Sequence, residues 1–245
     1  IRNQIFSLPS LMSFGKKPKE VQQVFRAVDN LSMKINYGES VGLVGESGCG
    51  KSTTSAMIMR LVDSTEGWIE FDGKDIGSVP AKHFARSPLR SKLQMVFQDP
   101  TDCLNPRFTA RQSISDPILV LGGQNSRRST DKRVDHLADL VGLPKKLLER
   151  FPHQLSGGQK ARVGIARAIA LDPKLLILDE PTAALDVSVQ AVVLNLLQEL
   201  KCQLDMSYLF ISHDLNVVRL LCDRVMVMQS GRIVEEGPTR KVMVE

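Results

Sequence analysis

A glycine-rich string at residues 45–52 carries the clearest chemical signal in this 245-residue sequence. It fits the pattern G-x-x-x-x-G-K-[ST], in which glycines let backbone N–H groups close around phosphate oxygens at the start of a helix. Lys51 would reach the outer phosphates of a nucleotide, and the Ser52 hydroxyl would ligate Mg²⁺. The residues predicted to bind phosphate are Gly45, Glu46, Ser47, Gly48, Cys49, Gly50, Lys51, Ser52 and Thr53.

The flanks of this string decide between a phosphate loop and a glycine-rich turn that binds nothing. An apolar run at 41–44 precedes the string, and residues 53–61 after it have helical spacing. A buried strand that enters a loop and then a helix is the context that the phosphate-binding pattern requires. We therefore predict a strand, a phosphate loop and a helix in that order.

Two adjacent carboxylates, Asp179 and Glu180, follow a second apolar run at 175–178. Such a pair is often only a polar turn. Downstream of a phosphate loop, however, a carboxylate at the end of a strand can meet Mg²⁺ across the sheet, directly or through water. The next residue projects differently and could polarise a water for attack on the γ-phosphate. We predict that Asp179 binds the metal and that Glu180 is the catalytic base.

His213 and Gln98 also follow apolar runs, at 207–212 and 93–97. Open α/β sheets bind ligands at the carboxyl ends of their strands, so both side chains are expected at that edge. A lone histidine there is more often structural, but the neighbouring phosphate machinery favours a γ-phosphate contact for His213. The Gln98 amide could touch Mg²⁺ or the attacking water, and it stands where the core meets a helical segment.

Strands that alternate with helices predict an α/β fold with a mostly parallel sheet. Residues 1–40 alternate apolar and polar positions and are expected to form antiparallel strands. Residues 100–152 are more polar, with helical spacing, and are expected to form an inserted helical lobe. Further strands are predicted at 41–44, 68–73, 93–97, 175–178, 207–212 and 224–228. Helices are predicted at 53–61, 130–141, 157–170 and 187–203.

The composition is that of an ordinary globular protein, with 42% hydrophobic and 24% charged residues. No apolar run approaches the ~20 residues of a membrane-spanning helix, and we expect no secretory signal. The net charge of +5 could suggest nucleic acid, but the basic residues are dispersed, so no nucleic-acid partner is expected. The cysteines lack metal-site spacing and are expected to be free thiols: Cys49, Cys103, Cys202 and Cys222.

Together with the segment Leu-Ser-Gly-Gly-Gln at 155–159, these motifs resemble the nucleotide-binding subunits of ATP-binding-cassette (ABC) transporters. The resemblance covers nearly the whole chain, and the motifs come in the family's order. In the family's terms they are the Walker A motif at 45–52, the Q-loop Gln98, the signature at 155–159, the Walker B motif at 175–180, the D-loop at 184–186 and the switch His213.

A closer resemblance is to the oligopeptide and dipeptide importer ATPases of bacteria. The matching phrases are Val-Phe-Gln-Asp-Pro at 96–100, Leu-Asn-Pro-Arg at 104–107, Pro-His-Gln at 152–154, Leu-Asp-Val-Ser-Val-Gln-Ala at 185–191, Ile-Ser-His-Asp-Leu at 211–215 and Gly-Arg-Ile-Val-Glu at 231–235. Two features depart from the group. Lys160 and Ala161 stand where it usually has Arg-Gln, and the sequence ends at Glu245, where relatives usually continue. Ile1 as the first residue hints at a piece of a longer protein.

The resemblance implies a P-loop NTPase (RecA-like) core at 1–98 and 166–245, and a helical subdomain at 99–165 that carries the signature. It implies ATP and Mg²⁺ as cofactors. The metal ligands would be Ser52, Gln98 and Asp179. The catalytic residues would be Glu180, His213, Lys51 and Gln98.

The resemblance further implies a head-to-tail dimer, in which ATP lies between one subunit's phosphate loop and the other's signature. The signature residues at the nucleotide would be Ser156, Gly157, Gly158 and Gln159. An aromatic side chain would stack on adenine, with Phe14 as the first choice and Phe25 as the alternative. The second cassette could be an identical subunit, a sister subunit or the other half of a fused double cassette.

The implied function is the ATPase subunit of a peptide importer, peripheral to the cytoplasmic face of the bacterial inner membrane. Its helical subdomain would contact transmembrane permease subunits. The alternative is a soluble ABC ATPase that acts on DNA or ribosomes, but the compact stretch between Gln98 and Leu155 holds no coiled coil or zinc insertion. A P-loop kinase or GTPase would lack the signature.

Overall fold

The structure, a computed structural model, describes residues 26–123 and 126–243. Its strands are β1 (Ser40–Val44), β2 (Glu70–Phe71), β3 (Lys74–Asp75), β4 (Leu93–Val96), β5 (Leu175–Asp179), β6 (Ser207–Ser212), β7 (Arg224–Gln229) and β8 (Arg232–Pro238). Its α-helices are α1 (Lys51–Ile58), α2 (Ala81–Phe84), α3 (Ala110–Leu121), α4 (Arg127–Leu140), α5 (Gly157–Ala168), α6 (Val187–Leu204), α7 (Leu215–Leu221) and α8 (Thr239–Val242). Short 3₁₀ helices are η1 (Pro88–Ser91), η2 (Lys145–Leu147) and η3 (Pro152–Gln154).

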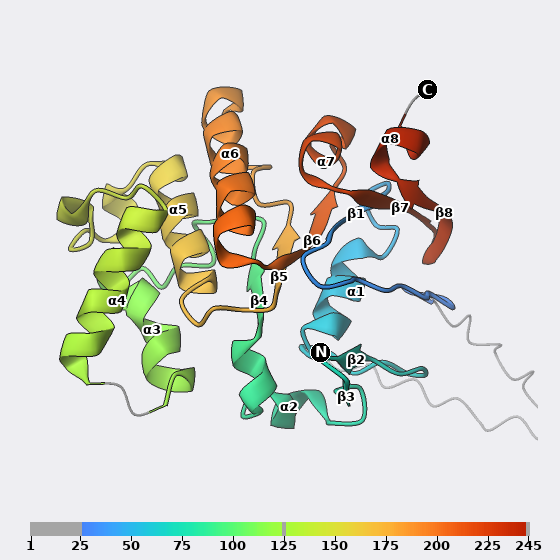
Figure 1. The fold of residues 1–245 in the computed structure, drawn as a ribbon, viewed down its shortest axis with the longest axis horizontal. Coiled ribbons are helices and arrows are strands. Elements are labelled where there is room, and N and C mark those ends of the chain that lie inside the picture. Colours follow the sequence, from blue (N-terminus) through green and yellow to red (C-terminus); the bar gives the residue numbers. More distant parts are fainter. Residues whose placement is uncertain (1–25, 124–125, 244–245) are drawn as a thin grey trace, which may run out of the picture.

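A six-stranded sheet crosses the molecule in the order β4-β5-β6-β1-β7-β8 (Figure 1). Neighbouring strands are parallel from β4 to β7, and β8 is antiparallel to β7. β2 and β3 form a separate antiparallel pair. The predicted α/β class, with a mostly parallel sheet and an antiparallel part, is confirmed.

Both faces of the sheet are covered, and β5 shows how the sequence achieves this. Side chains alternate between the two faces of a strand. Leu176 and Leu178 belong to a buried cluster with residues of α3, α4, α5, α6 and α7. Leu175 and Ile177 belong to a second cluster, which contains Met59 directly after α1. A run of four apolar residues therefore serves two faces, as expected for a buried parallel strand.

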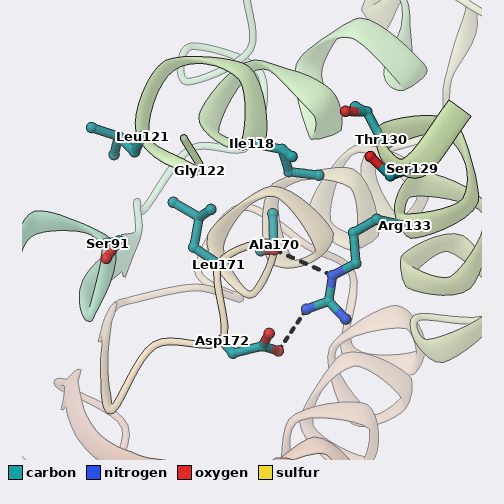
Figure 2. Close-up of a pocket in the computed structure, with 10 residues that line it drawn as sticks. All are labelled: Ser91, Ile118, Leu121, Gly122, Ser129, Thr130, Arg133, Ala170, Leu171 and Asp172. Atoms are coloured by element: carbon teal, nitrogen blue, oxygen red, sulfur yellow. Dashed lines mark hydrogen bonds and ion pairs between the residues drawn. The ribbon is translucent and has the colours of Figure 1, made fainter. Parts of the chain in front are cut away.

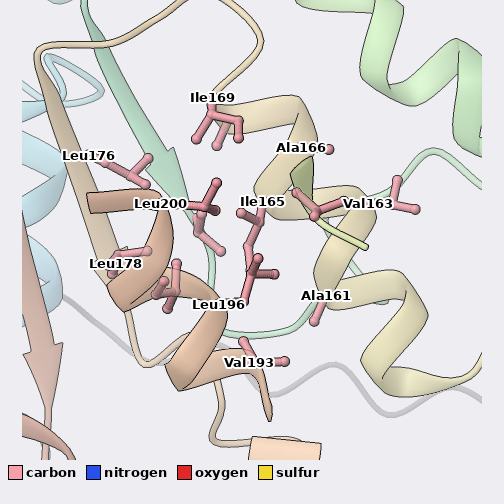
Figure 3. Packing of buried hydrophobic residues seen from close by; sticks show 14 of the residues in the cluster. Ala161, Val163, Ile165, Ala166, Ile169, Leu176, Leu178, Val193, Leu196 and Leu200 are labelled. Carbon is pink, nitrogen blue, oxygen red and sulfur yellow. The ribbon is translucent and has the colours of Figure 1, made fainter. Parts of the chain in front are cut away.

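Helices α5 and α6 pack on the first of these faces (Figure 3). Ile165 of α5 and Ile169, directly after α5, meet Leu196 and Leu200 of α6 above Leu176 of β5, and all five side chains are buried. Burying an aliphatic side chain of this size contributes roughly 1.5–3 kcal/mol. This packing fixes the position of α5, and with it the segment at which α5 begins.

Helices α3 and α4 lie in the segment 100–152, where the sequence predicts a helical lobe, and α5 matches the helix predicted at 157–170; the three helices are called the helical region (Figure 1). Ile114 of α3 and Leu137 of α4 are fully buried in the same cluster as Leu176 of β5. The hydrophobic interior of this region is thus continuous with that of the sheet. The predicted division between core and helical subdomain at 165 falls inside α5, and it stays a prediction.

The N-terminal antiparallel strands expected before β1 do not appear where the structure describes the chain. Residues 1–25 lie outside the described part, and residues 26–39 form no strand. Val28, Met33 and Ile35 are instead partly buried against the second cluster. The alternating pattern therefore reflects burial on one side of a segment that pairs with no neighbouring strand.

Several elements escaped the sequence prediction because their patterns are weak. The edge strand β8 carries Arg232, Glu235 and Glu236, and charged side chains on an edge strand discourage pairing with other chains. The short helices α2 and α7 were not predicted. Helix α4 begins three residues earlier than predicted, because the Ser126 hydroxyl accepts a hydrogen bond from the backbone N–H of Ser129 and caps its start. The four cysteines are free thiols, as predicted.

The two tyrosines of the chain provide a matched test of the packing on the first face. Tyr208 is fully buried and its hydroxyl donates to the Leu197 carbonyl at 2.9 Å, whereas Tyr37 is 70% exposed. Tyr208→Phe should lower the free energy of unfolding by about 1 kcal/mol, because a buried hydrogen bond is lost. Tyr37→Phe, the same chemical change at the surface, should have little effect. Urea denaturation measures both, and equal effects would contradict the prediction.

Candidate functional site

The carboxyl ends of the parallel strands converge at one edge of the sheet. Val44, the last residue of β1, pairs with Ser212 at the end of β6. On the other side of β6, Asp179 at the end of β5 pairs with Ile211. Because the strands run parallel and end level, the segments that follow them leave the sheet together. These segments carry the phosphate loop, Gln98, Glu180 and His213.

The phosphate loop, residues 45–50, is held too close to its neighbours for any residue other than glycine at two positions. A Cβ on Gly45 would lie 2.1 Å from the Met228 carbonyl oxygen. Gly50 has φ 111° at the start of α1, and a Cβ there would lie 2.3 Å from the Ala27 carbonyl oxygen. The glycines predicted from the phosphate-binding pattern are therefore also required by packing within the chain.

Lys51 is the buried cation of the loop. It is 6% exposed, and its Nζ donates to the carbonyl oxygens of Gly45 at 2.7 Å and Glu46 at 2.8 Å. The ammonium group thus lies across the loop it follows. The loop residues Glu46, Ser47 and Gly48 and the helix residue Ser52 are exposed, Thr53 is half-buried and Cys49 is buried.

Asp179 is a buried carboxylate next to this loop, 8% exposed. Burial raises its pKa above the ordinary value, and the nearby Glu180 charge acts in the same direction. Hydrogen bonds from Ser52 and Ser55 and the positive charge of Lys51 oppose the rise. The structure therefore brings together Ser52 and Asp179, two of the three predicted metal ligands, around a carboxylate that a cation would stabilise.

The Glu180 side chain contacts the two polar residues that follow β4 and β6. Its Oε1 lies 3.0 Å from Nδ1 of His213, and its Oε2 accepts from Nε2 of Gln98 at 3.4 Å. Its backbone has φ 45° and is tied by its N–H to the Ile211 carbonyl at 2.9 Å. A left-handed conformation is uncommon for glutamate and is often found at functional sites. The structure thus places the predicted base between the two predicted polar partners.

The signature residues lie apart from this cluster within the chain. Ser156 caps α5: its Oγ accepts from the N–H of Gln159, and the Gln159 Oε1 accepts from the N–H of Ser156. A reciprocal capping box therefore occupies both side chains, a role that the sequence analysis missed. Helix α5 lies on the first face of the sheet, whereas the phosphate loop leads into α1 on the second face (Figure 1).

The turn between β7 and β8 is a second feature that no sequence pattern predicted, and it bonds to the phosphate loop. In the turn between β7 and β8, the Gly231 N–H donates to the Cys49 carbonyl at 2.9 Å. The Gly231 carbonyl accepts from the N–H of Asp29 at 2.9 Å, and Arg232 pairs with the Asp29 carboxylate at 2.6 Å. No local pattern links residues 29, 49 and 231.

The two adenine-stacking candidates, Phe14 and Phe25, lie outside the described residues.

One surface hollow, with a volume of about 420 Å³, is lined by residues of α3, α4, η1 and the segment after α5 and by none of the phosphate-loop residues (Figure 2). Arg133 crosses it and bonds to the Asp172 carboxylate at 2.5 Å and the Ala170 carbonyl at 3.3 Å. Its charge is thus already paired, at the carboxyl end of α5. This arrangement explains Arg133 as a helix-terminus partner and gives it no nucleotide role.

A family model described as ABC transporter matches residues 28–183. The chain belongs to this family. The match covers the phosphate loop, Gln98, the segment 155–159 and the two carboxylates, and it ends before His213. The resemblance drawn from the motifs alone is thereby confirmed.

Curated relatives in bacteria are similar over most of this ABC chain. A putative peptide import ATP-binding protein of Brucella abortus (strain 2308) is 50% identical over 224 residues, which are 91% of this chain and 66% of the relative. The oligopeptide transport ATP-binding protein OppF of Escherichia coli (strain K12) is 46% identical over 225 residues, 91% of this chain and 65% of the relative. The chain spans just under two thirds of these relatives.

Solved ABC structures share the fold. A dimeric post-hydrolysis state of the ATP-binding cassette MJ0796, bound to ADP and Pi, has a TM-score of 0.80 at 30% identity, and the match covers 91% of this chain and 95% of that one. CbiO1 from Clostridium perfringens, described as part of the ABC transporter complex cbiONQ, has a TM-score of 0.79 at 34% identity, with 89% and 84% covered.

The contact between α5 and α6 yields a prediction about the signature. A Cβ on Gly158 would lie 2.6 Å from Cγ1 of Val189, so Gly158→Ala should lower the free energy of unfolding by about 1–3 kcal/mol through overpacking. Gly164→Ala is a control in the same helix, because its Cβ would meet nothing within 4 Å. Adding Val189→Ala to Gly158→Ala should restore part of the loss. Equal stability of the two single variants in urea would refute the packing role.

The buried Asp179 yields a prediction with a defined pH dependence. Because its pKa is raised in the folded state, its contribution to stability falls as pH rises from 3.8 through the folded value. Asp179→Asn should therefore raise the free energy of unfolding of the metal-free protein at pH 7, by about 1 kcal/mol. The exposed Asp116→Asn is the control and should change little. Urea unfolding at pH 7 measures both, and a destabilised Asp179→Asn would contradict this account.

Proposed function

We propose that the chain is the ATP-binding and ATP-hydrolysing part of a bacterial ABC importer for oligopeptides or dipeptides. The observation that carries the proposal is the position of Glu180, held between Gln98 and His213 beside the buried Asp179 and the phosphate loop. The peptide-import names of relatives that are 46–50% identical support the cargo class. They favour a transport role over a soluble ATPase that acts on DNA or ribosomes.

Mg²⁺ fits the donor atoms at the phosphate loop. The proposed ligands, the Ser52 hydroxyl, the Gln98 amide oxygen and the Asp179 carboxylate, are the hard oxygen donors that Mg²⁺ prefers. The described residues contain no cluster of three or more His, Cys, Asp or Glu that could hold a metal by itself. This suits Mg²⁺, which is commonly bound by one or two carboxylates together with water and substrate phosphates. Once bound, the ion would neutralise charge on the phosphates.

Glu180 is the proposed general base. Its ionised carboxylate would accept a proton from the water that attacks the γ-phosphate. A proton on Nδ1 of His213 lets the ring donate to Oε1 of Glu180, and this bond holds the carboxylate in one orientation. Gln98 donates to the other oxygen, so a change at the Q-loop would be felt directly at the base.

A second cassette is proposed to complete the site. Ser156 and Gly157 are exposed at the amino end of α5, where backbone N–H groups and the helix dipole favour an anion. They lie across the sheet from the phosphate loop of their own chain, so a phosphate bound at that loop would meet the signature of a partner. An identical subunit, a sister subunit and a fused second cassette would each serve. Loss of the γ-phosphate would remove the anion between the halves and open the dimer.

The helical region is the proposed contact with transmembrane permease subunits, at the cytoplasmic face of the inner membrane. Leu119 and Val120 of α3 are 59% and 69% exposed, and exposed apolar side chains that lie together often mark an interaction surface. No helix among the described residues has the length and hydrophobicity to cross a bilayer. The permeases of such an importer would supply the membrane path.

The variant Glu180→Gln tests the proposal. It removes the base and keeps the shape of the side chain, so it should bind Mg-ATP, lose turnover and accumulate as a dimer. Size-exclusion chromatography with light scattering, with and without Mg-ATP, measures the mass. Adding Lys51→Ala should abolish the ATP-dependent mass increase. A Glu180→Gln variant that hydrolyses ATP at the original rate would exclude Glu180 as the base.

A further inference from the structure

A second hollow lies at the end of α1 that is farther from the phosphate loop. Its volume is about 700 Å³, within the range of sites for small molecules. The lining comes from the carboxyl end of α1, from α2 and from the approach to β4. The lining residues are Met59, Arg60, Leu61, Asp63, Pro80, Ala81, Lys82, Phe84, Ala85 and Arg90.

The charge of this hollow is positive. Arg60, Lys82 and Arg90 line it, and Asp63 is the only acidic residue of the lining. The sequence reinforces the imbalance, because residues 76–98 contain no aspartate or glutamate. A concave surface with one sign of charge focuses its field and concentrates ions of the opposite sign.

Arg60 is a buried cation with donors that lack partners. Its side chain is 1% exposed, and its Nη2 donates to Asp63 at 2.6 Å and to the Val79 carbonyl at 2.6 Å. Its Nε and Nη1 are buried and have no hydrogen-bond partner among the residues that the structure describes. Leaving a buried donor unpaired costs about 1–3 kcal/mol, and more for a charged group. These two nitrogens lie below the solvent-accessible surface, so Arg60 acts on an anion in the hollow through its charge.

Arg90 adds a cation whose charge is not balanced. It is partly buried, and its Nη1 makes only a long hydrogen bond, of 3.5 Å, to the Leu93 carbonyl. In the described part of the chain it forms no ion pair with a carboxylate. Burial lowers its pKa, which is the expected response of a cation that lacks a counter-charge. The contrast is Arg133 in the hollow of Figure 2, which is paired with Asp172.

We infer that this hollow is an oxyanion-binding site, in which Lys82 and Arg90 contact a phosphate or a carboxylate and the buried charge of Arg60 attracts it. Guanidinium groups match the geometry of both anions through paired N–H donors. The site is distinct from the phosphate loop, because the eight residues of α1 separate the two by about 12 Å along the helix. Helix α1 begins at the phosphate loop and ends at the hollow. The anion could be free in solution or carried by an acidic side chain of a partner.

Backbone amide NMR of the whole chain provides the test. Inorganic phosphate is titrated in the presence of saturating Mg-ADP, which fills the phosphate loop. Wild type should show saturable shifts at residues 59–63 and 80–90. Arg90→Gln should weaken the binding about tenfold, the loss expected for a charge-assisted hydrogen bond. Arg86→Gln removes the same charge from an exposed residue outside the lining and should leave the binding unchanged.

Linear shifts without saturation in wild type would overturn the inference, as would equal weakening by Arg86→Gln, which would indicate a diffuse charge effect. A parallel titration with acetate separates the sources. Tighter binding of phosphate supports a free phosphate ligand, and tighter binding of acetate supports an acidic side chain. The shifts that Mg-ADP itself causes at residues 45–52 test nucleotide binding separately, so failure of one idea leaves the other measurable.

Discussion

The parallel register of β4, β5, β6 and β1 is the constraint on which the candidate site depends. Hydrogen bonds between these strands fix which residues end level, and this brings Asp179 beside Ile211 and Val44 beside Ser212. A shift of one residue in any pair would turn every side chain of the shifted strand to the opposite face and separate Glu180 from His213. The register is stable because both faces of the sheet are buried, so each slip would expose apolar side chains.

Stability and function oppose each other at this edge. The phosphate loop packs closely between the end of β7, the turn that follows it and the segment near Ala27. Glu180 is held in a left-handed conformation. The carboxylate of Asp179 is buried, and burial disfavours its charged form. Each feature costs free energy in the chain alone, and the proposed function gives each a use once a phosphate and a cation are bound. The two buried clusters supply the stability that tolerates them.

The chain also separates features that its proposed function must join. Helix α5 and the phosphate loop pack on different faces of the sheet, which is why a second cassette is proposed to bring a signature to the phosphate. The second hollow, lined by Arg60 and Arg90, lies at the end of α1 that is farther from the phosphate loop. Helix α1 connects it to the phosphate loop, and β4 connects it to Gln98. The sheet and its helices thus hold the three proposed anion-binding surfaces, the phosphate loop, the amino end of α5 and the hollow beyond α1, at fixed positions.

The sequence by itself determined most of the fold and indicated the residues of the candidate site. The phosphate loop, Asp179, Glu180, Gln98 and His213 were each placed by a local pattern, because a polar residue directly after an apolar run lies at a strand end. Local patterns could not show what depends on distant neighbours. The tertiary structure alone revealed that Val189 packs against Gly158 and that the Gly231 N–H donates to the Cys49 carbonyl. It also showed that the described residues before β1, 26–39, form no strand. These outcomes depend on contacts between residues far apart in the chain, which composition and spacing do not encode.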